Sequence, residues 1–346
     1  MNRPAVRLAL CVVVLLAAGA VAWAAPVWRS GGKPALAAAL DAVPRSTLAF
    51  SFTDWHAVRD RFPGSGGDVA TAASTRDVTS RSVLESTADG LQKTFGWSVD
   101  DLAWEAYAQS ADSSVLVVRL DDSLPLSTVT KGLRSAGYQR DGDTWTIDAA
   151  RLRSAEVSDL LATVHVHARE HVLVASDVAA GVRQADRVMA GRAPALASDP
   201  AMARTAQALA GTDAIFVQRG RLGCESTAVS DPEALAAAAT AEQRAGRLTT
   251  YAASGRAITD RGGSGFAGQS LRFAMTFDDP SVARRQLEVR SALTQGQFIG
   301  RTGQVADTLR LDDASTDGST LTLDFRHDPD TDAFMSGAGA VLFATC

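Results

Sequence analysis

Lysine is nearly absent from this chain of 346 residues: it occurs only at Lys33, Lys93 and Lys131, so arginine supplies nearly all of the 34 basic side chains. The 39 acidic side chains outnumber them, the formal net charge is −5, and no basic run stands out. Proteins that bind nucleic acids need clustered cations to displace the counterions of the phosphate backbone. The composition therefore argues against a nucleic-acid-binding surface.

Long uncharged apolar runs are also rare, and the one at the N-terminus covers residues 8–25, after Arg3 and Arg7. The sequence Ala22-Trp23-Ala24 then has the small-x-small pattern of a cleavage site. The run is at the lower length limit of a membrane-spanning helix. Residues 1–28 are therefore interpreted as a signal peptide or a membrane anchor. In both cases the positive flank stays inside and the rest of the chain is exported.

Cysteine is scarce, and only Cys11, Cys224 and Cys346 are present. Cys11 belongs to the apolar leader, and the bulky Leu10 before it argues against a lipid-modified cysteine. Export places the other two thiols in an oxidising compartment, where structural disulfides persist. We therefore predict a disulfide between Cys224 and Cys346, with Cα atoms about 4.4–6.8 Å apart.

The pattern of apolar residues, caps and turns predicts a mixture of strands and helices. The expected strands cover 47–52, 102–109, 113–120, 213–219, 248–259 and 270–277, with hairpins over 138–148, 163–176 and 308–325. The expected helices cover 35–43, 55–62, 79–95, 125–137, 178–190, 230–246, 279–293 and 328–344, and 64–75 is expected to be a loop.

Two parts of the chain resemble each other. The segment "SVLVVRLDDSLPLSTVTKGLRSAG" is echoed by "SLRFAMTFDDPSVARRQLEVRSAL", so that Asp121-Asp122 matches Asp278-Asp279. The predicted fold class is therefore α+β: two diverged repeats of antiparallel sheet, each covered by helices on one face, after an N-terminal apolar helix. The expected units are a spacer (29–34), a first repeat (35–190), a connecting segment (191–211) and a second repeat (212–346).

The segment "HVLVASDVAAGVRQADRVMAGRAPALASDPAMARTAQALAGTDAIFVQ" and the opening "LDAVPRSTLAFSFTDW" resemble a family of uncharacterised, exported or membrane-anchored bacterial proteins. The similarity covers about half of the chain. It implies an exported domain of two repeats, and it brings no catalytic residues.

The stretch "HVHAREH" is the strongest candidate for a site. His165 and His167 share one face of a strand, and two imidazoles can bind a metal. His167, Glu170 and His171 also match the H-x-x-E-H pattern of zinc peptidases, which requires a helix. The flanking residues alternate as strands, so a solvated hairpin face is favoured. His165, His167 and His171 remain weak candidates for metal ligands.

Other patterns have simpler interpretations. The alternating aspartates of residues 328–333 lack the glycine and glutamate of a calcium loop and suit a helix N-terminus. The glycine-rich residues 261–268 lack the lysine of a phosphate loop. The aspartate pairs at 121–122 and 278–279 suit helix caps. No set of nucleophile, base and orienting residue is visible, so no catalytic residue and no cofactor is assigned.

The sequence therefore favours a non-enzymatic protein of the cell envelope that binds an unknown partner or ligand outside the membrane. One alternative is an exported metal-dependent hydrolase that uses His165, His167, Glu170 and His171. Another is a structural spacer domain tethered to the membrane by its N-terminal segment.

Overall fold

The computed structural model describes residues 33–62, 69–262, 266, 268–299, 303–327 and 341–346. The expected N-terminal apolar helix, most of the spacer and most of the helix expected over 328–344 lie outside these residues, as do the aspartates of residues 328–333. No helix among the described residues is both long and apolar enough to cross a membrane.

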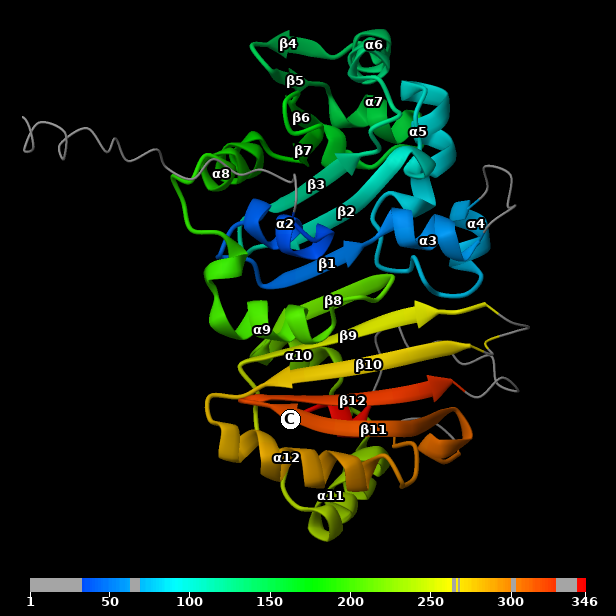
Figure 1. The fold of residues 1–346 in the computed structure, drawn as a ribbon, viewed down its shortest axis with the longest axis vertical. Helices are drawn as coiled ribbons and strands as arrows, with labels where there is room; N and C mark the ends of the chain where they lie inside the picture. The colour runs from blue at the N-terminus through cyan, green and yellow to red at the C-terminus, as the bar shows by residue number, and fades with distance from the viewer. Residues whose placement is uncertain (1–32, 63–68, 263–265, 267, 300–302, 328–340) are drawn as a thin grey trace, which may run out of the picture.

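The described strands form a single twelve-stranded sheet in which every neighbouring pair is antiparallel. The order is β11-β12-β10-β9-β8-β1-β2-β3-β7-β6-β5-β4 (Figure 1). The bounds are β1 Ala49–Thr53, β2 Leu102–Gln109, β3 Ser114–Leu120, β4 Gln139–Asp141, β5 Thr144–Thr146, β6 Thr163–His167, β7 Val172–Ser176, β8 Ala214–Arg219, β9 Ala253–Asp260, β10 Gln269–Thr276, β11 Leu309–Asp317 and β12 Thr320–His327.

The central pair of the two halves is β1 with β8, in which Phe50 lies opposite Val217. This pairing joins the strands of the first half of the chain (β1–β7) to those of the second half (β8–β12). The expected antiparallel strands are confirmed, and they form one continuous sheet. Counted outwards from β1, β3 is the third strand, and it pairs with β7, the second strand of the hairpin β6–β7. Counted outwards from β8, β10 is the third strand, and it pairs with β12, the second strand of the hairpin β11–β12.

Helices lie on both faces of the sheet, so the expectation of helices on one face is wrong. The α-helices are α2 Ala35–Ala42, α3 Trp55–Arg61, α4 Val69–Ser74, α5 Ala88–Phe95, α6 Leu126–Ala136, α7 Ala149–Ser154, α8 Ala179–Met189, α9 Pro200–Ala208, α10 Gly220–Ser226, α11 Pro232–Ala245 and α12 Pro280–Leu293. Residues of α2, α8 and α9 form one core with the sheet, and residues of α3–α7, α11 and α12 contribute to the other.

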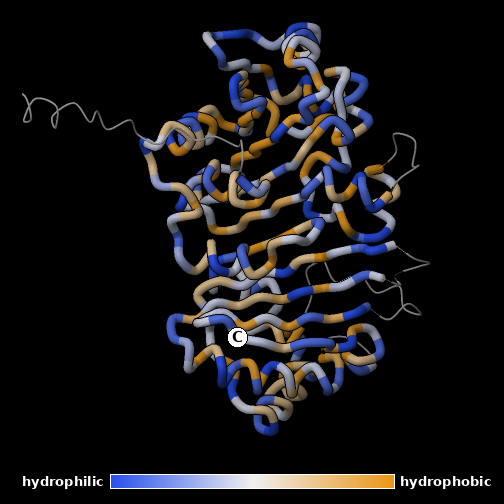
Figure 2. The backbone as a smooth tube through the Cα atoms, viewed as in Figure 1, coloured by the Kyte–Doolittle hydropathy of each residue, from blue (hydrophilic) through white to orange (hydrophobic). Residues whose placement is uncertain are grey.

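Both cores follow from the alternation of side chains along each strand. In β3, Val115 and Val117 belong to one core, whereas Leu116 and Val118 belong to the other. A strand that is buried on both faces needs apolar residues at successive positions. Figure 2 shows apolar segments along the central strands and hydrophilic segments at many of the turns.

Several predicted helix ends are confirmed. The carboxylate of Asp54 accepts a hydrogen bond from the backbone N–H of Ala57 at the start of α3. Asp231 caps α11 and Asp279 caps α12, each with proline at the first helical position. Gly137 ends α6 with φ +88°, a conformation that favours glycine.

Other elements differ from the expectation. The region expected to be a loop over 64–75 contains α4, and the helix expected over 79–95 begins only at α5, after a 3-10 turn at Glu85–Thr87. The helix expected over 178–190 is α8, whose N-cap Val178 makes no side-chain capping bond. The connecting segment 191–211 contains α9, which packs on β8, β9 and β10.

The C-terminus is fixed to the second half of the chain. The predicted disulfide is confirmed: Cys224 on α10 is bonded to Cys346, with 5.3 Å between the Cα atoms. The fully buried guanidinium of Arg290 donates to the carbonyl oxygens of Phe343 and Thr345, both at 2.8 Å. These contacts order the last residues of the chain.

Candidate functional site

Strand β6 places two imidazoles on one face of the sheet. His165 and His167 are two positions apart, and their rings stack with 4.2 Å between centroids. Helix α8, which covers this face next to β7, supplies a carboxylate between them. The Nδ1 of His165 lies 2.7 Å from one oxygen of Asp186, and the Nε2 of His167 lies 2.9 Å from the other. We call His165, His167 and Asp186 the His-His-Asp cluster.

The electrostatics of the His-His-Asp cluster favour a charged carboxylate. Burial by itself would raise the pKa of Asp186, but the hydrogen bonds and positive charge of His165 and His167 outweigh it and lower the pKa to about 2. The hydrogen bond to Asp186 raises the pKa of His165 above its ordinary value, and burial opposes this change. Asp186 is therefore ionised at neutral pH.

The cluster has the donor chemistry of a transition-metal site. The two imidazole nitrogens and a carboxylate oxygen lie within 4.8 Å of one another, and this is the only such group of three or more among the described residues. Two histidines and one carboxylate suit zinc, iron or copper, and three protein ligands leave positions open for water. The side chains are about one-fifth exposed, so solvent reaches the cluster.

His171 and Glu170 do not join this cluster. His171 lies in the turn between β6 and β7 with φ +57°, and its Nδ1 is 3.5 Å from the Oδ1 of Asp122. The residues from His167 to His171 form the end of a strand and a turn, not the helix that H-x-x-E-H chemistry requires. The structure thus brings together two of the three weak metal candidates, His165 and His167. Asp186 was missed because it is distant in sequence.

The aspartate pairs have different roles in the two halves. Asp279 caps α12, whereas α6 begins after Pro125 without a side-chain cap. Asp121 accepts hydrogen bonds from Ser123 and from Arg59, and Asp122 pairs with Arg119. The cap expected for Asp121-Asp122 is therefore wrong. The loop expected over 261–268 is described only in part, between β9 and β10.

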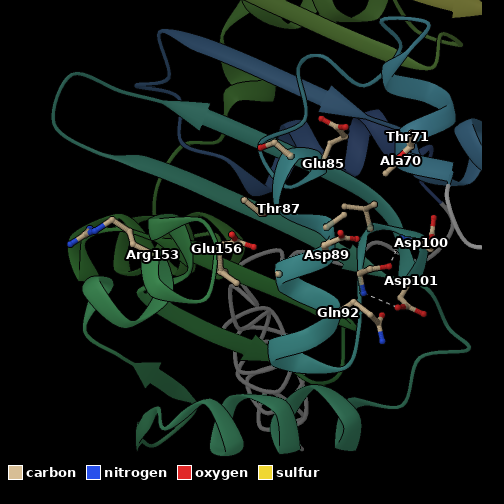
Figure 3. A pocket seen from close by; sticks show the side chains of 16 residues that line it. Ala70, Thr71, Glu85, Thr87, Asp89, Gln92, Asp100, Asp101, Arg153 and Glu156 are labelled. Atoms are coloured by element: carbon tan, nitrogen blue, oxygen red, sulfur yellow. Dashed lines mark hydrogen bonds between the residues drawn. The ribbon is translucent and has the colours of Figure 1, made fainter.

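Besides the His-His-Asp cluster, the structure has a pocket beside α5, on the opposite face of the sheet from α8. It has a volume of about 1060 Å³. Figure 3 shows that its charged side chains come from separate segments of the chain. The lining includes the acidic residues Glu85, Asp89, Asp100, Asp101 and Glu156 and the basic residue Arg153. Burial raises the pKa of Glu85. No sequence pattern indicates this pocket, because its residues are brought together only by the fold.

Comparison with known proteins gives little further information. No family model matches the chain, and no curated protein matches it. The structure is similar to crystal form I of TP0453, with a TM-score of 0.39 and 10% identity over 84% of this chain and 92% of that chain. Crystal form IV of TP0453 gives a TM-score of 0.40 and 10% identity over 88% and 94%. At these scores the likeness carries no argument about fold or function.

Proposed function

We propose that this chain is an exported, non-enzymatic protein of the cell envelope that binds a divalent transition-metal ion through His165, His167 and Asp186. The observation that carries the proposal is the convergence of two imidazole nitrogens on one carboxylate. Asp186 is already ionised and aligned by its hydrogen bonds, so the ligands need little rearrangement. The metal would replace the protons that the histidines now share with Asp186.

A binding role is favoured over hydrolysis by the position of the remaining H-x-x-E-H residues. A zinc peptidase of that type needs both histidines of the motif on the metal and the glutamate beside the bound water. Here His171 contacts Asp122, on the loop after β3. The His-His-Asp cluster therefore has metal ligands without the general base that the motif would supply.

The proposed location outside the cytoplasm is supported by the N-terminal apolar run after Arg3 and Arg7. It is also supported by the disulfide of Cys224 with Cys346, since such bonds persist in oxidising compartments. The N-terminal segment then acts as a signal peptide or a membrane anchor. We also propose that the protein acts on a partner outside the membrane. We further propose that it belongs to the family of exported or membrane-anchored bacterial proteins that its sequence resembles.

We also propose that the chain consists of two diverged repeats. The support is the strand order on either side of the central pair: β1, β2, β3, β7, β6 in one direction and β8, β9, β10, β12, β11 in the other. A helix follows the third strand in both directions, α6 after β3 and α12 after β10. The hairpin of β4 and β5 is then an addition to the first repeat.

The test is metal binding by the exported chain after treatment with a chelator. Zinc added to this protein should bind at one equivalent by calorimetry. Variants His165→Ala and His167→Ala should each weaken binding about 100-fold or more, because one of three protein ligands is lost. Asp186→Asn should also weaken binding, since it removes the charge and keeps the shape.

The matched control is His171→Ala, which removes a histidine from the same hairpin but outside the His-His-Asp cluster. This variant should bind zinc like the unchanged protein. Equal loss in His171→Ala and His167→Ala, or no zinc binding at all, would refute the metal proposal. Zinc-dependent hydrolysis of a peptide that disappears in Glu170→Gln would instead support the hydrolase.

A further inference from the structure

A second site is indicated by a buried arginine near the centre of the sheet. Arg256 lies on β9, directly opposite Phe216 on β8, and is only 7% exposed. Its guanidinium lies 5.3 Å from the centroid of the Phe216 ring. Arg81 lies against the same ring at 4.2 Å. Two guanidinium groups therefore share one aromatic side chain on the face of the sheet that carries α3 to α7.

Among the described residues, no salt bridge balances the charge of Arg256, and its Nε has no hydrogen-bond partner. Burial, together with the charge of Arg81, lowers the pKa of Arg256 to about 9, and the opposing effect of Asp77 is smaller. Buried charges in proteins are normally paired, since an unpaired one is expensive to desolvate. The contact with Phe216 offsets only part of this cost.

A small cavity lies next to the guanidinium of Arg256. Its volume is about 20 Å³, and its polar lining side chains are Gln218, Ser226, Thr227, Ser254 and Arg256. No carboxylate among the described residues lines it. The hydroxyl of Ser226 donates to the Oε1 of Gln218 at 2.8 Å, which leaves the amide Nε2 of Gln218 as a donor. The cavity thus combines a positive charge with hydrogen-bond donors.

We propose that this cavity binds a single halide ion, with chloride as the physiological occupant, held by Arg256 with help from the amide of Gln218. The negative charge of the ligand is inferred from the buried positive charge of Arg256 and from the lack of a carboxylate among the described lining residues. Its size follows from the volume, which holds one water-sized particle and is too small for phosphate or a carboxylic acid. The ion neutralises Arg256 on β9, one strand away from the pairing of β8 with β1.

The first test uses crystals of the unchanged protein grown with bromide, whose anomalous scattering identifies the ion. A bromide peak should lie within about 4 Å of the Arg256 guanidinium. Water alone in this cavity, with bromide only at exposed arginines such as Arg221, would overturn the proposal. This measurement requires no variant and is therefore independent of any folding defect.

The second test is urea unfolding at constant ionic strength as gluconate is replaced by chloride. Chloride should raise the folding equilibrium constant by the factor 1 + [Cl⁻]/Kd, about tenfold at nine times the Kd. Arg256→Met should remove this dependence, and the exposed control Arg221→Met should retain it. An identical chloride dependence in Arg256→Met and the unchanged protein would contradict the proposal. The metal proposal is unaffected by either result, because the His-His-Asp cluster is on β6 and α8.

Discussion

Removal of the disulfide between Cys224 and Cys346 should be among the most destabilising changes outside the cores. The bond closes a loop over 122 residues of sequence separation. In the chain-entropy model, a loop of this length restricts the unfolded chain by about 5 kcal/mol. A domain of ordinary stability has about 5–15 kcal/mol in total. The double variant Cys224→Ser, Cys346→Ser should therefore lose a large share of its stability.

The folded state should nevertheless keep its C-terminal contacts in this double variant. Arg290 still binds the carbonyl oxygens of Phe343 and Thr345, and Tyr251 still donates to the carbonyl oxygen of Ala344. The effect should thus come mainly from the unfolded chain, with a measured loss of about 2–5 kcal/mol.

The assay is urea unfolding of the chain without residues 1–28, with and without a reductant. The oxidised unchanged protein should unfold at a higher urea concentration than the double variant. A reductant should lower the unfolding midpoint of the unchanged protein and leave that of the double variant where it is. A loss below about 1 kcal/mol on reduction would refute the entropy argument, because a loop of this length cannot be closed at so small a cost. A reductant effect on the double variant would show that another process is being measured.

Two further predictions concern buried charges. Arg290→Met should destabilise the protein by about 3–5 kcal/mol in urea, because it leaves the buried carbonyl groups of Phe343 and Thr345 without a donor; an unchanged midpoint would contradict this. The stability advantage of the metal-free protein over Asp186→Asn should depend on pH. Because its pKa is raised in the folded state, His165 contributes to the free energy of unfolding. This contribution is complete below about pH 6.5 and is lost as the pH rises through the pKa of His165 in the folded protein. Because its pKa is lowered in the folded state, Asp186 also contributes to the free energy of unfolding. This contribution is present above the ordinary aspartate pKa of 3.8 and is lost as the pH falls towards about 2. The difference in urea midpoint should thus be largest between about pH 4 and pH 6.5, and a difference that is flat with pH would contradict this.

Local signals in the sequence predicted much of the secondary structure. The Asp141-Gly142 turn, where Gly142 has φ +60°, gave the hairpin of β4 and β5. Alternating apolar residues gave β6 and β7, and aspartates before proline gave the starts of α11 and α12. Errors arose where local signals were weak, as in α4 and α10, which are short and contain small or polar residues. Tertiary packing stabilises such short helices, which would not persist alone.

The candidate metal site was only half visible in the sequence. The spacing of His165 and His167 placed them on one strand face because side chains alternate along a strand. The third ligand, Asp186, comes from the helix that packs over that face, and no local pattern records which helix does so. The proximity of His171 in sequence was misleading, because a turn directs it towards Asp122.

The sequence by itself thus determined the features that depend on short-range chemistry or on counting. These are the strand and helix periodicities, most helix caps, the hairpin turns and the pairing of the only two cysteines outside the apolar leader. The tertiary structure alone decided which distant segments meet: β1 with β8 in one continuous sheet, helices on both faces, Asp186 between two histidines, and Arg256 beside a cavity without a carboxylate. The physical reason is that backbone preferences act over a few residues, whereas burial and charge pairing depend on the packing of the whole chain.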